Sequence, residues 1–246
     1  MNKLQSIYAK VMYDPGTIGI FINPFYFLRK GIIDGISANK KYLKGKMMDF
    51  GCGTKPYKNI LDVEEYIGVD IELPDDKVNN QVDVYYDGKT MPFKTNYFES
   101  VLASEVFEHI FNLEEILGEI FRVLKPGGHM VATLPFAWDE HGVPYDFARY
   151  TSFGINHLLK EAGFYVVKIE KSTNYVEAIF QMWNAFVFQH VFPENSLLKV
   201  ILTPIFIAPT TLLGMFLAKI LPENRNYYNN NIVVARKPTR RKIVVT

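Results

Sequence analysis

Short apolar runs alternate with amphipathic stretches from residue 47 onward. Apolar runs that stop at a polar or turn residue are typical of buried parallel strands, and the stretches between them are typical of crossover helices. Four such runs come first along the chain: 47–50, 66–69, 100–103 and 129–134. The pattern predicts an α/β fold built on a parallel sheet.

The clearest amphipathic stretch covers residues 113–124, where apolar side chains recur at helical spacing. Asn112 and Glu115 predict a capping pair at its start, and we expect Pro126, Gly127 and Gly128 to end the helix. Three later elements are predicted: a helix at 153–162, a strand at 164–170 and a last strand at 232–235.

Between the last two predicted strands, residues 200–218 carry no charged side chain, and this length could span a bilayer. If strands 164–170 and 232–235 are neighbours in one sheet, the chain must leave and return, so a single crossing is excluded. Polar side chains within 175–192 would be costly in lipid, and we expect Pro204 and Pro209 to break the apolar run. These polar residues are Glu177, Gln181, Asn184, Gln189 and His190.

We therefore expect a helical hairpin in this region. It would lie in a membrane interface with Trp183 and other aromatic residues as anchors, pack against another subunit, or cover the protein's own core. The apolar run 18–28, which Arg29 and Lys30 follow, could join the same surface.

Charge and cysteine content narrow the function classes. A formal net charge of +1 and a pI near 7.7 do not favour binding to nucleic acid. The basic tail 236–242 is expected to be a solvated end, with contact to an anionic surface as the alternative. Cys52 is the single cysteine, so no internal disulfide can form, and no Cys/His group has zinc-ligand spacing. The absence of an apolar core in the first residues argues against a cleaved signal. We therefore expect a metal-independent cytoplasmic protein.

A glycine-rich turn, MMDFGCGTKPY, follows the first predicted strand. Gly51 and Gly53 let the backbone approach a ligand closely. A dinucleotide is disfavoured, because Pro56 stands where the fingerprint needs a third small residue and Asp49 would repel a pyrophosphate. Asp49 would instead attract a ligand that carries an ammonium and a sulfonium, as S-adenosylmethionine does.

Two further acids follow in order. Asp70 ends the second predicted strand, at the interval where a carboxylate meets ribose hydroxyls. Asp83 comes one element later, where an adenine amino group needs an acceptor, and the Val84 amide could donate to a ring nitrogen. Each acid alone could be a turn or cap residue, but the three in this order predict a nucleoside site.

The chain resembles the class I S-adenosylmethionine-dependent methyltransferases, specifically type 11. The matching segments are DFGCG at 49–53, GVDIE at 68–72, MPF at 91–93, SVLASEVFEHI at 100–110 and EIFRVLKPGGHMVATLP at 119–135. The resemblance implies a Rossmann-like, doubly wound sheet of seven strands with the last strand antiparallel. It also implies a cofactor site formed by Asp49, Gly51, Cys52, Gly53, Asp70, Ile71, Asp83, Val84, Ser104 and Glu105. Lys55 and Pro56 depart from the family pattern and allow only a short or distorted helix after the glycines.

The segment after the fifth strand, PFAWDEHGVPYDFARYT, is dense in polar and aromatic groups. We expect His141 to act as a general base or to orient the substrate, and Arg149 to bind an anionic or polar part of the acceptor. The alternative is a polar loop in which Asp146 and Arg149 pair with each other. His109 is a second catalytic candidate, and its alternative role is packing or capping. Similar strings in methyltransferases of surface polysaccharide clusters hint at a glycan acceptor.

These observations predict one methyltransferase domain over 1–246. It would comprise an N-terminal segment 1–45, a cofactor-binding core 46–170, a hydrophobic helical insertion 171–230, and a last strand with basic tail 231–246. We expect O-methylation of a glycan, lipid-linked sugar or related small molecule.

The rival functions are C- or N-methylation of a membrane quinone precursor, and a non-catalytic membrane-associated scaffold. We expect no nucleic-acid partner. Residues 175–221 are expected to contact the inner face of a membrane or a second copy of the chain.

Overall fold

The structure is a computed structural model that describes residues 8, 11–72 and 81–239. The chain divides into two compact units. The sheet unit comprises Ile36–Glu170 and Asn231–Thr246, and the helical unit comprises Met1–Gly35 and Lys171–Asn230. The predicted insertion 171–230 therefore falls in the helical unit. The organisation of the chain as one domain stays a prediction.

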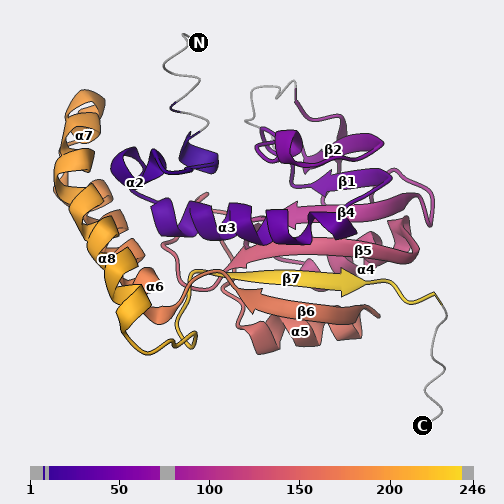
Figure 1. The fold of residues 1–246 in the computed structure, drawn as a ribbon. Coiled ribbons are helices and arrows are strands. Elements are labelled where there is room, and N and C mark those ends of the chain that lie inside the picture. The colour runs from indigo at the N-terminus through magenta and orange to yellow at the C-terminus, as the bar shows by residue number, and fades with distance from the viewer. Residues whose placement is uncertain (1–7, 9–10, 73–80, 240–246) are drawn as a thin grey trace. The chain divides into compact units, whose positions relative to one another are not determined.

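Seven strands form a single sheet in the order β3-β2-β1-β4-β5-β7-β6 (Figure 1). Strands β1 to β5 pair in parallel, and β7 runs in the opposite direction to β5 and β6. This confirms the predicted fold class. The bounds are Lys46–Phe50 (β1), Glu65–Ile71 (β2), Val84–Tyr86 (β3), Phe98–Ser104 (β4), Leu124–Pro135 (β5), Tyr165–Lys171 (β6) and Asn230–Arg236 (β7).

Helices α4 (Leu113–Val123) and α5 (Ser152–Glu161) pack their apolar stripes on one face of this sheet. Ile116 and Ile120 of α4 and Ile155 of α5 share a fully buried cluster with strand residues such as Met48 and Met130. The Thr151 hydroxyl caps α5 by accepting from the Gly154 N–H. Burial of these side chains stabilises the sheet by about 1.5–3 kcal/mol each.

The connection after β1 contains only the 3₁₀ helix η2 (Lys58–Ile60), as Lys55 and Pro56 predicted. The longer helix α3 (Tyr26–Asn39) crosses the boundary between the units. Two further 3₁₀ helices, η1 (Lys40–Tyr42) and η3 (Phe107–His109), belong to the sheet unit.

Two local expectations around α4 were wrong, namely the start of the next strand and the cap at Asn112. Helix α4 ends at Val123, just before Pro126, Gly127 and Gly128, as predicted, but β5 begins at Leu124 and not at residue 129, so these three residues lie inside the strand. Gly127 has φ 83° and its N–H donates to the Lys237 carbonyl, while the register against β4 shifts between Phe98 and Ser100, so an irregular strand accommodates the proline. Asn112 does not cap the helix backbone, because its side-chain amide donates to Glu115 Oε2 and to the Gly88 carbonyl.

The expectation of a solvated basic tail is also wrong at Lys237, which is buried. Its ammonium donates to the carbonyls of Phe121 and Leu124 at the end of α4 and to Asn96 Oδ1, at 2.7–2.8 Å. Unpaired carbonyls at a helix C-terminus attract a cation in this way. Residues 240–246 of the predicted tail lie outside the described residues.

The helical unit contains a helical hairpin, as the sequence predicted. Helix α6 (Tyr175–Phe186) continues into a π-type turn, η4 (Val187–Val191), and the chain returns through α7 (Ser196–Leu202), the π-type turn η5 (Thr203–Ile207) and α8 (Ala208–Ile220). The short helix α2 (Gly19–Ile22) and the first part of α3 belong to the same unit.

Pro204 and Pro209 do not break the apolar helix, contrary to expectation. Residues Ser196–Ile220 form one continuous helix in which both prolines lie at the first positions of a new helical segment. The wider hydrogen-bond spacing of the π-type turn removes the need for the missing N–H groups.

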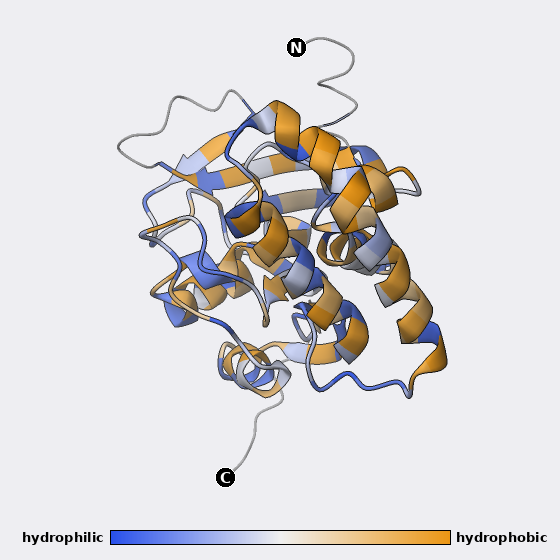
Figure 2. Ribbon diagram, turned by 90° about the vertical axis from the view of Figure 1, so that its left-hand side faces the viewer, coloured by the Kyte–Doolittle hydropathy of each residue, from blue (hydrophilic) through white to orange (hydrophobic). Residues whose placement is uncertain are grey.

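The polar side chains of α6 are satisfied inside the helical unit. Gln181 accepts from the Leu28 N–H and donates to the Pro24 carbonyl, and the Asn184 amide donates to Thr211 Oγ1 at 2.9 Å. Gly214 lets α8 approach α6 closely, because a Cβ there would lie 2.8 Å from the Phe180 ring. These polar groups therefore face the hairpin's interior, whereas many apolar side chains of the hairpin are exposed. The ribbon coloured by hydropathy shows that most residues of these helices are hydrophobic (Figure 2).

Candidate active site

The strand order reverses between β1 and β4, so the loops after these strands diverge and leave an opening at the carboxyl edge of the sheet. Residues of three neighbouring strand ends meet at this edge. The residues are Asp49 and Gly51 at β1, Asp70 at β2, and Ser104 and Glu105 at β4. The parallel pairing sets Asp49 beside both Gly68 and Leu102.

The glycine turn after β1 needs its glycines. Gly51 has φ 68°, and a Cβ there would lie 2.3 Å from Val106 Cγ2. Gly53 has φ 47°, and a Cβ there would meet no atom within 4 Å, so the space above it is open. The turn is therefore shaped by the close approach of the segment after β4 and leaves room for a ligand over Gly53.

Asp49 is a buried carboxylate whose Oδ2 accepts a short hydrogen bond from the Tyr66 hydroxyl. Burial raises the pKa of Asp49 to about 7, and the negative charge of Asp70 acts in the same direction, whereas the Tyr66 bond and Lys55 oppose the rise. The same burial, with the nearby Asp49 charge, raises the pKa of Tyr66. A cationic group beside Asp49 would restore the ionised carboxylate, as the sequence argument for an ammonium requires.

Asp70 holds the glycine turn in place. Its Oδ2 accepts from the Gly53 N–H and its Oδ1 accepts from the Ile71 N–H, both at 2.9 Å. A carboxylate has about four lone-pair positions, so two ribose hydroxyls can still be accommodated. The role of Asp70 toward a ribose stays a prediction.

Asp83 was expected at the end of an element, but it directly precedes β3. Its Oδ2 accepts from the Gly68 N–H at 2.7 Å and pairs with Lys55 Nζ at 2.5 Å. The Lys55 ammonium and the Gly68 N–H lower the pKa of Asp83 against the effect of desolvation. Lys55 itself has φ 53°, and its chain crosses over Gly68, where a Cβ would lie 2.2 Å from Lys55 Cε.

Asp87, which sequence reasoning missed, directly follows the carboxyl end of β3. Its Oδ1 accepts from the N–H groups of Lys89 and Thr90, and these bonds lower its pKa. Ile71 lies beside this turn, because a Cβ on Gly88 would be 3.1 Å from Ile71 Cδ1. The position of Asp87 four residues before MPF was the available signal, and the short β3 hid it.

Ser104 and Glu105 close the edge at β4. The Ser104 and Thr133 hydroxyls are 2.8 Å apart, and Thr133 donates to Glu105 Oε1 at 2.7 Å. Glu105 has φ 53°, a left-handed conformation that is costly for a non-glycine residue and is concentrated at functional sites. Of the other predicted cofactor residues, Cys52 is buried, and burial raises the pKa of its thiol to about 12; Val84 begins β3.

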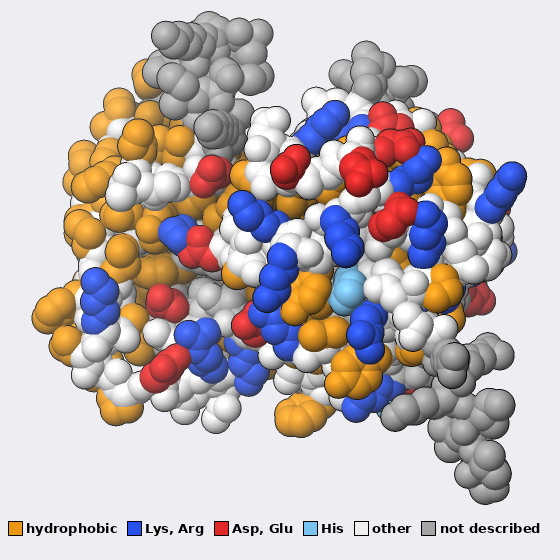
Figure 3. Space-filling model, turned by 45° about the vertical axis from the view of Figure 1, so that its right-hand side comes forward, with side chains coloured by type: hydrophobic (Ala, Val, Ile, Leu, Met, Phe, Trp, Pro, Cys, Tyr) orange, Lys and Arg blue, Asp and Glu red, His pale blue; other side chains and the backbone are white. Residues whose placement is uncertain are grey.

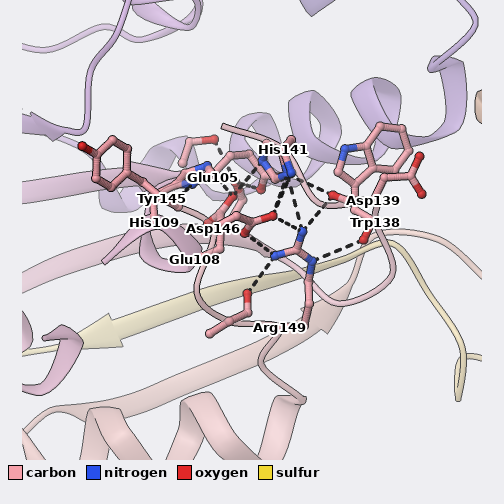
Figure 4. A network of polar contacts seen from close by, with 12 residues as sticks. Glu105, Glu108, His109, Trp138, Asp139, His141, Tyr145, Asp146 and Arg149 are labelled. Atoms are coloured by element: carbon pink, nitrogen blue, oxygen red, sulfur yellow. Dashed lines mark hydrogen bonds and ion pairs between the residues drawn. The ribbon is translucent and has the colours of Figure 1, made fainter. Parts of the chain in front are cut away.

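A second cluster of polar side chains follows directly along the chain (Figure 4). Glu108 and His109 lie in η3 after β4, and His141 lies in the loop after β5. Nε2 atoms of both histidines lie 3.7 Å from Glu108 Oε1, and the two rings meet edge to face at 4.7 Å. The structure thus brings together His109 and His141, the two candidate histidines, which are 32 positions apart in the sequence. It also places Glu108 between them, a residue that the sequence analysis had not identified as a candidate.

Arg149 and Asp146 form a paired fork, which is the alternative that the sequence left open. Arg149 contacts both Asp146 oxygens at 2.6 Å and also donates to the carbonyls of Trp138, Asp139 and Ala148. The guanidinium lowers the pKa of Asp146 to about 2. Arg149 therefore braces the loop 138–149, and its binding of an acceptor stays a prediction.

The His141 ring is held by the same network. Its backbone N–H donates to Asp146 Oδ2 at 2.9 Å, and its Nδ1 lies 3.1 Å from the Asp139 carbonyl. The Glu108 carboxylate, the Asp139 carbonyl and Asp146 raise the pKa of His141. The loop after β5 thus has one fixed arrangement at the edge of the sheet.

Comparison with known proteins agrees with this geometry. Residues 48–132 match a family model described as a methyltransferase domain. The sterol 24-C-methyltransferase erg6 of Schizosaccharomyces pombe is 30% identical over 49% of this chain, and the chain spans only 38% of that protein.

Two solved structures share the fold. A structure described as a putative sarcosine dimethylglycine methyltransferase from Galdieria sulphuraria has a TM-score of 0.52 at 15% identity, covering 86% of each chain. The Haemonchus contortus phosphoethanolamine N-methyltransferase 2, in complex with S-adenosyl-L-methionine, has a TM-score of 0.52 at 17% identity, covering 97% of this chain and 60% of that one.

The fold, with its open edge between β1 and β4 lined by glycines and acids, is the fold of the class I methyltransferases. Residues 48–132, about a third of the chain, match the methyltransferase-domain model, and solved methyltransferases share the fold of the whole sheet. These matches support the predicted resemblance to the S-adenosylmethionine-dependent methyltransferases, and S-adenosylmethionine is the cofactor of that family.

Proposed function

We propose that this protein transfers the methyl group of S-adenosylmethionine to a hydroxyl group of a glycan, a lipid-linked sugar or a related small molecule. The observation that carries the proposal is that the predicted cofactor-binding residues and a cluster of two histidines and a glutamate follow each other at the end of β4. Glu105 at the cofactor edge is followed after three residues by the Glu108–His109–His141 cluster. Imidazole and carboxylate groups beside a methyl donor suit an acceptor that must lose a proton.

The reaction is an in-line displacement. A lone pair of the acceptor oxygen forms a bond to the methyl carbon, and the carbon–sulfur bond breaks with its electron pair moving to sulfur. The products are the methyl ether, neutral S-adenosylhomocysteine and the hydroxyl proton, which passes to a base or to solvent. The protein's contribution is to orient the two groups and to exclude water.

On the cofactor side, we assign the ammonium to Asp49, the methionine part to the turn Gly51–Gly53, and the ribose hydroxyls to Asp70. Asp87 and Ile71 are our assignment for the adenine, because Asp87 follows a strand's carboxyl end whereas Asp83 is already paired with Lys55. Ser104 and Glu105 would close the site.

On the acceptor side, His141 is our first candidate for the group that handles the hydroxyl proton, and His109 is the second. Arg149 supports His141 through Asp146, which bonds both residues. The exposed side chains of Tyr145 and Phe147 lie on the same loop and could stack on a sugar ring.

One observation favours a second candidate function. The curated relative that matches this chain at 30% identity is named for methylation at carbon. C-methylation of a lipid-soluble small molecule, such as a quinone precursor, is therefore the alternative.

We also propose that the helical unit contacts the inner face of a membrane. Within the described residues, one helix, Ser196–Ile220, is long and apolar enough to cross a bilayer, a criterion that core helices of soluble proteins also meet. Only 28% of its apolar window is buried, unlike a core helix. Orange side chains accordingly gather over α7 and α8 (Figure 3).

Exposed members of this apolar surface come from both arms of the hairpin. They include Trp183 and Phe186 on α6, Leu197 on α7, Phe206 on η5 and Phe216 on α8. Such a surface favours interfacial binding over a span, because the hairpin returns to the strand β7; a second copy of the chain is the alternative partner.

The test uses purified full-length chain and S-adenosylmethionine with a labelled methyl group. Soluble glycans, lipid-linked glycans and quinone precursors are offered separately, with Asp70→Ala as the inactive control. We expect label on an oxygen of a glycan or lipid-linked sugar. Label on carbon would establish the alternative, and binding of the cofactor without transfer to any acceptor would contradict the O-methylation proposal.

A further inference from the structure

The Glu108 carboxylate is an unusual group in the sheet unit. Its side chain has no solvent-exposed surface, and neither of its oxygens accepts a hydrogen bond from the described residues. The two histidine nitrogens at 3.7 Å are beyond hydrogen-bond range. A buried carboxylate without donors is costly, and native proteins normally pair such a group with a cation or a metal ion.

Both histidines turn their Nε2 atoms toward this carboxylate. His109 Nδ1 lies 2.6 Å from the Tyr145 carbonyl oxygen, and His141 Nδ1 lies 3.1 Å from that of Asp139. A carbonyl can only accept, so Nδ1 of His109 carries a hydrogen, and so does Nδ1 of His141, whose 3.1 Å carbonyl contact is shorter than its 3.5 Å approach to Arg149 Nη2. When such a ring is neutral, its lone pair is on Nε2. A backbone carbonyl on the far nitrogen is the usual support of a metal-bound histidine.

The three groups have the spacing of ligands around one ion. One oxygen of Glu108 and one nitrogen from each histidine all lie within 4.8 Å of one another. Ligand atoms at about 2.0–2.2 Å from a cation are about 3–4.4 Å apart, and both 3.7 Å separations between Glu108 and the histidines fall in this range.

Access and open positions are also present. The side chains of His109 and His141 are 26% and 35% exposed, whereas Glu108 is closed off, so an ion would enter from the histidine side. Three protein ligands leave coordination positions for water or for an oxygen of a substrate.

We propose that Glu108, His109 and His141 bind a divalent transition-metal cation, which holds the hydroxyl oxygen of the methyl acceptor. The role of the cation, but not its binding, rests on the proposed function. The expectation of a metal-independent protein rested only on the absence of Cys/His groups with zinc-ligand spacing along the sequence. These ligands instead come from two strand ends that the fold brings together.

A cation at this position would change the task of the histidines. Their Nε2 lone pairs would bind the metal, so they would not accept the hydroxyl proton themselves. The metal would lower the pKa of the coordinated hydroxyl, whose proton would leave to solvent before the oxygen attacks the methyl carbon. An acceptor with two neighbouring hydroxyls could chelate the ion, and this favours a sugar or another vicinal diol.

Two nitrogen ligands and one carboxylate favour Zn²⁺, Co²⁺, Fe²⁺ or Mn²⁺ over Mg²⁺ and Ca²⁺, which prefer all-oxygen sites. Calorimetric titration of the chelator-treated, full-length protein with Zn²⁺ and with Mn²⁺ tests this directly. Co²⁺ adds a visible absorption that reports nitrogen ligation. We expect one ion per chain, with Mg²⁺ binding at least tenfold more weakly.

Glu108→Gln, His109→Ala and His141→Ala should each weaken binding at least tenfold, and the exposed helix residue His157 serves as the control through His157→Ala. Glu108→Gln gives a second readout that separates a metal site from a merely structural cluster. It removes a buried negative charge that accepts no hydrogen bond from the described residues, so the metal-free variant should melt at a higher temperature than the metal-free parent at a pH where the histidines are neutral. It should also lose the rise in Tm that the metal gives the parent.

One-to-one binding that falls with these three substitutions and not with His157→Ala supports the site. Binding that is insensitive to the three substitutions overturns it, as does the absence of binding by folded protein. S-adenosylmethionine binding is measured on the same samples, and its retention in either negative case shows that the methyltransferase proposal has not failed with the metal site.

Discussion

Protonation of Asp49 should control how tightly the cofactor binds near neutral pH. The carboxylate is buried with a pKa of about 7, and the ammonium of S-adenosylmethionine would bind its ionised form. Between pH 7.5 and pH 6 the ionised fraction falls from about three quarters to about one tenth. The dissociation constant should therefore rise about eightfold over this interval, which corresponds to about 1.2 kcal/mol.

Calorimetry at the two pH values measures this change, and the cofactor's own amino group stays mostly protonated over the interval. Near pH 7, binding should also release about half a proton, which buffers of different ionisation enthalpy reveal. Asp49→Asn keeps the side-chain volume and removes the titration, so its binding should be weaker at pH 7.5 and independent of pH. Equal affinity of the parent at pH 7.5 and pH 6 would refute the reasoning.

The same shift has a consequence for stability. The folded-state pKa of about 7 lies above the reference value of 3.8, so the contribution of Asp49 is fully present below pH 4 and is lost as pH rises through 7. The ionised carboxylate costs at most about 4 kcal/mol at pH 8. Asp49→Asn should therefore melt at a higher temperature than the parent at pH 8 and at a similar temperature at pH 4.

Three further predictions concern the turn, the loop and the helical unit. Gly51→Ala should lower Tm and cofactor affinity, because Gly51 has a φ of 68° and a Cβ there would lie 2.3 Å from Val106. Adding Val106→Ala should restore part of the loss. If nothing is restored, the contact with Val106 is not the cause. Arg149→Lys should lower the free energy of unfolding in denaturant by about 1–3 kcal/mol, because the two-bonded pair with Asp146 is lost. The exposed control Arg225→Lys should lower it by less than about 0.5 kcal/mol, as surface changes do. Equal effects of the two substitutions would argue against a stabilising role of Arg149 in the loop 138–149. The double substitution Trp183→Ser and Phe206→Ser should reduce flotation of the protein with anionic vesicles. The control Phe153→Ser, which changes an exposed aromatic residue of the sheet unit, should not reduce it. Unchanged flotation of the double variant would contradict membrane binding by the helical unit.

Local patterns were sufficient for most of the sheet. Strand ends at Phe50, Ser104 and Pro135 were predictable because a polar or turn residue follows each apolar run. The start of β5 was not, because Pro126, Gly127 and Gly128 normally indicate a turn, and only pairing with β4 and with the chain after β7 keeps them in a strand. Pro204 misled in the same way, because a π-type turn accommodates a proline that a regular helix would not.

The positions of candidate site residues were predictable where they belong to a single strand end. They were not predictable where residues from two strand ends must come together. Asp49 lies within the first apolar run, and Gly51 and Asp70 directly follow the first and second runs, so their position follows from the sheet alone. Glu108 became visible only when the fold brought His141 to it, since nothing in the local sequence links residues 108 and 141. Asp87 was hidden by the short strand β3, whose end could not be separated from Asp83 by pattern alone.

The central claim is that the edge between β1 and β4 binds S-adenosylmethionine. Calorimetric titration of the purified chain with S-adenosylmethionine and with S-adenosylhomocysteine tests it most directly, in parallel with Asp70→Ala and with His157→Ala as the matched control. The account predicts micromolar binding of both ligands that Asp70→Ala weakens at least tenfold and His157→Ala leaves unchanged. Folded protein that binds neither ligand, or binding that Asp70→Ala does not affect, would contradict it.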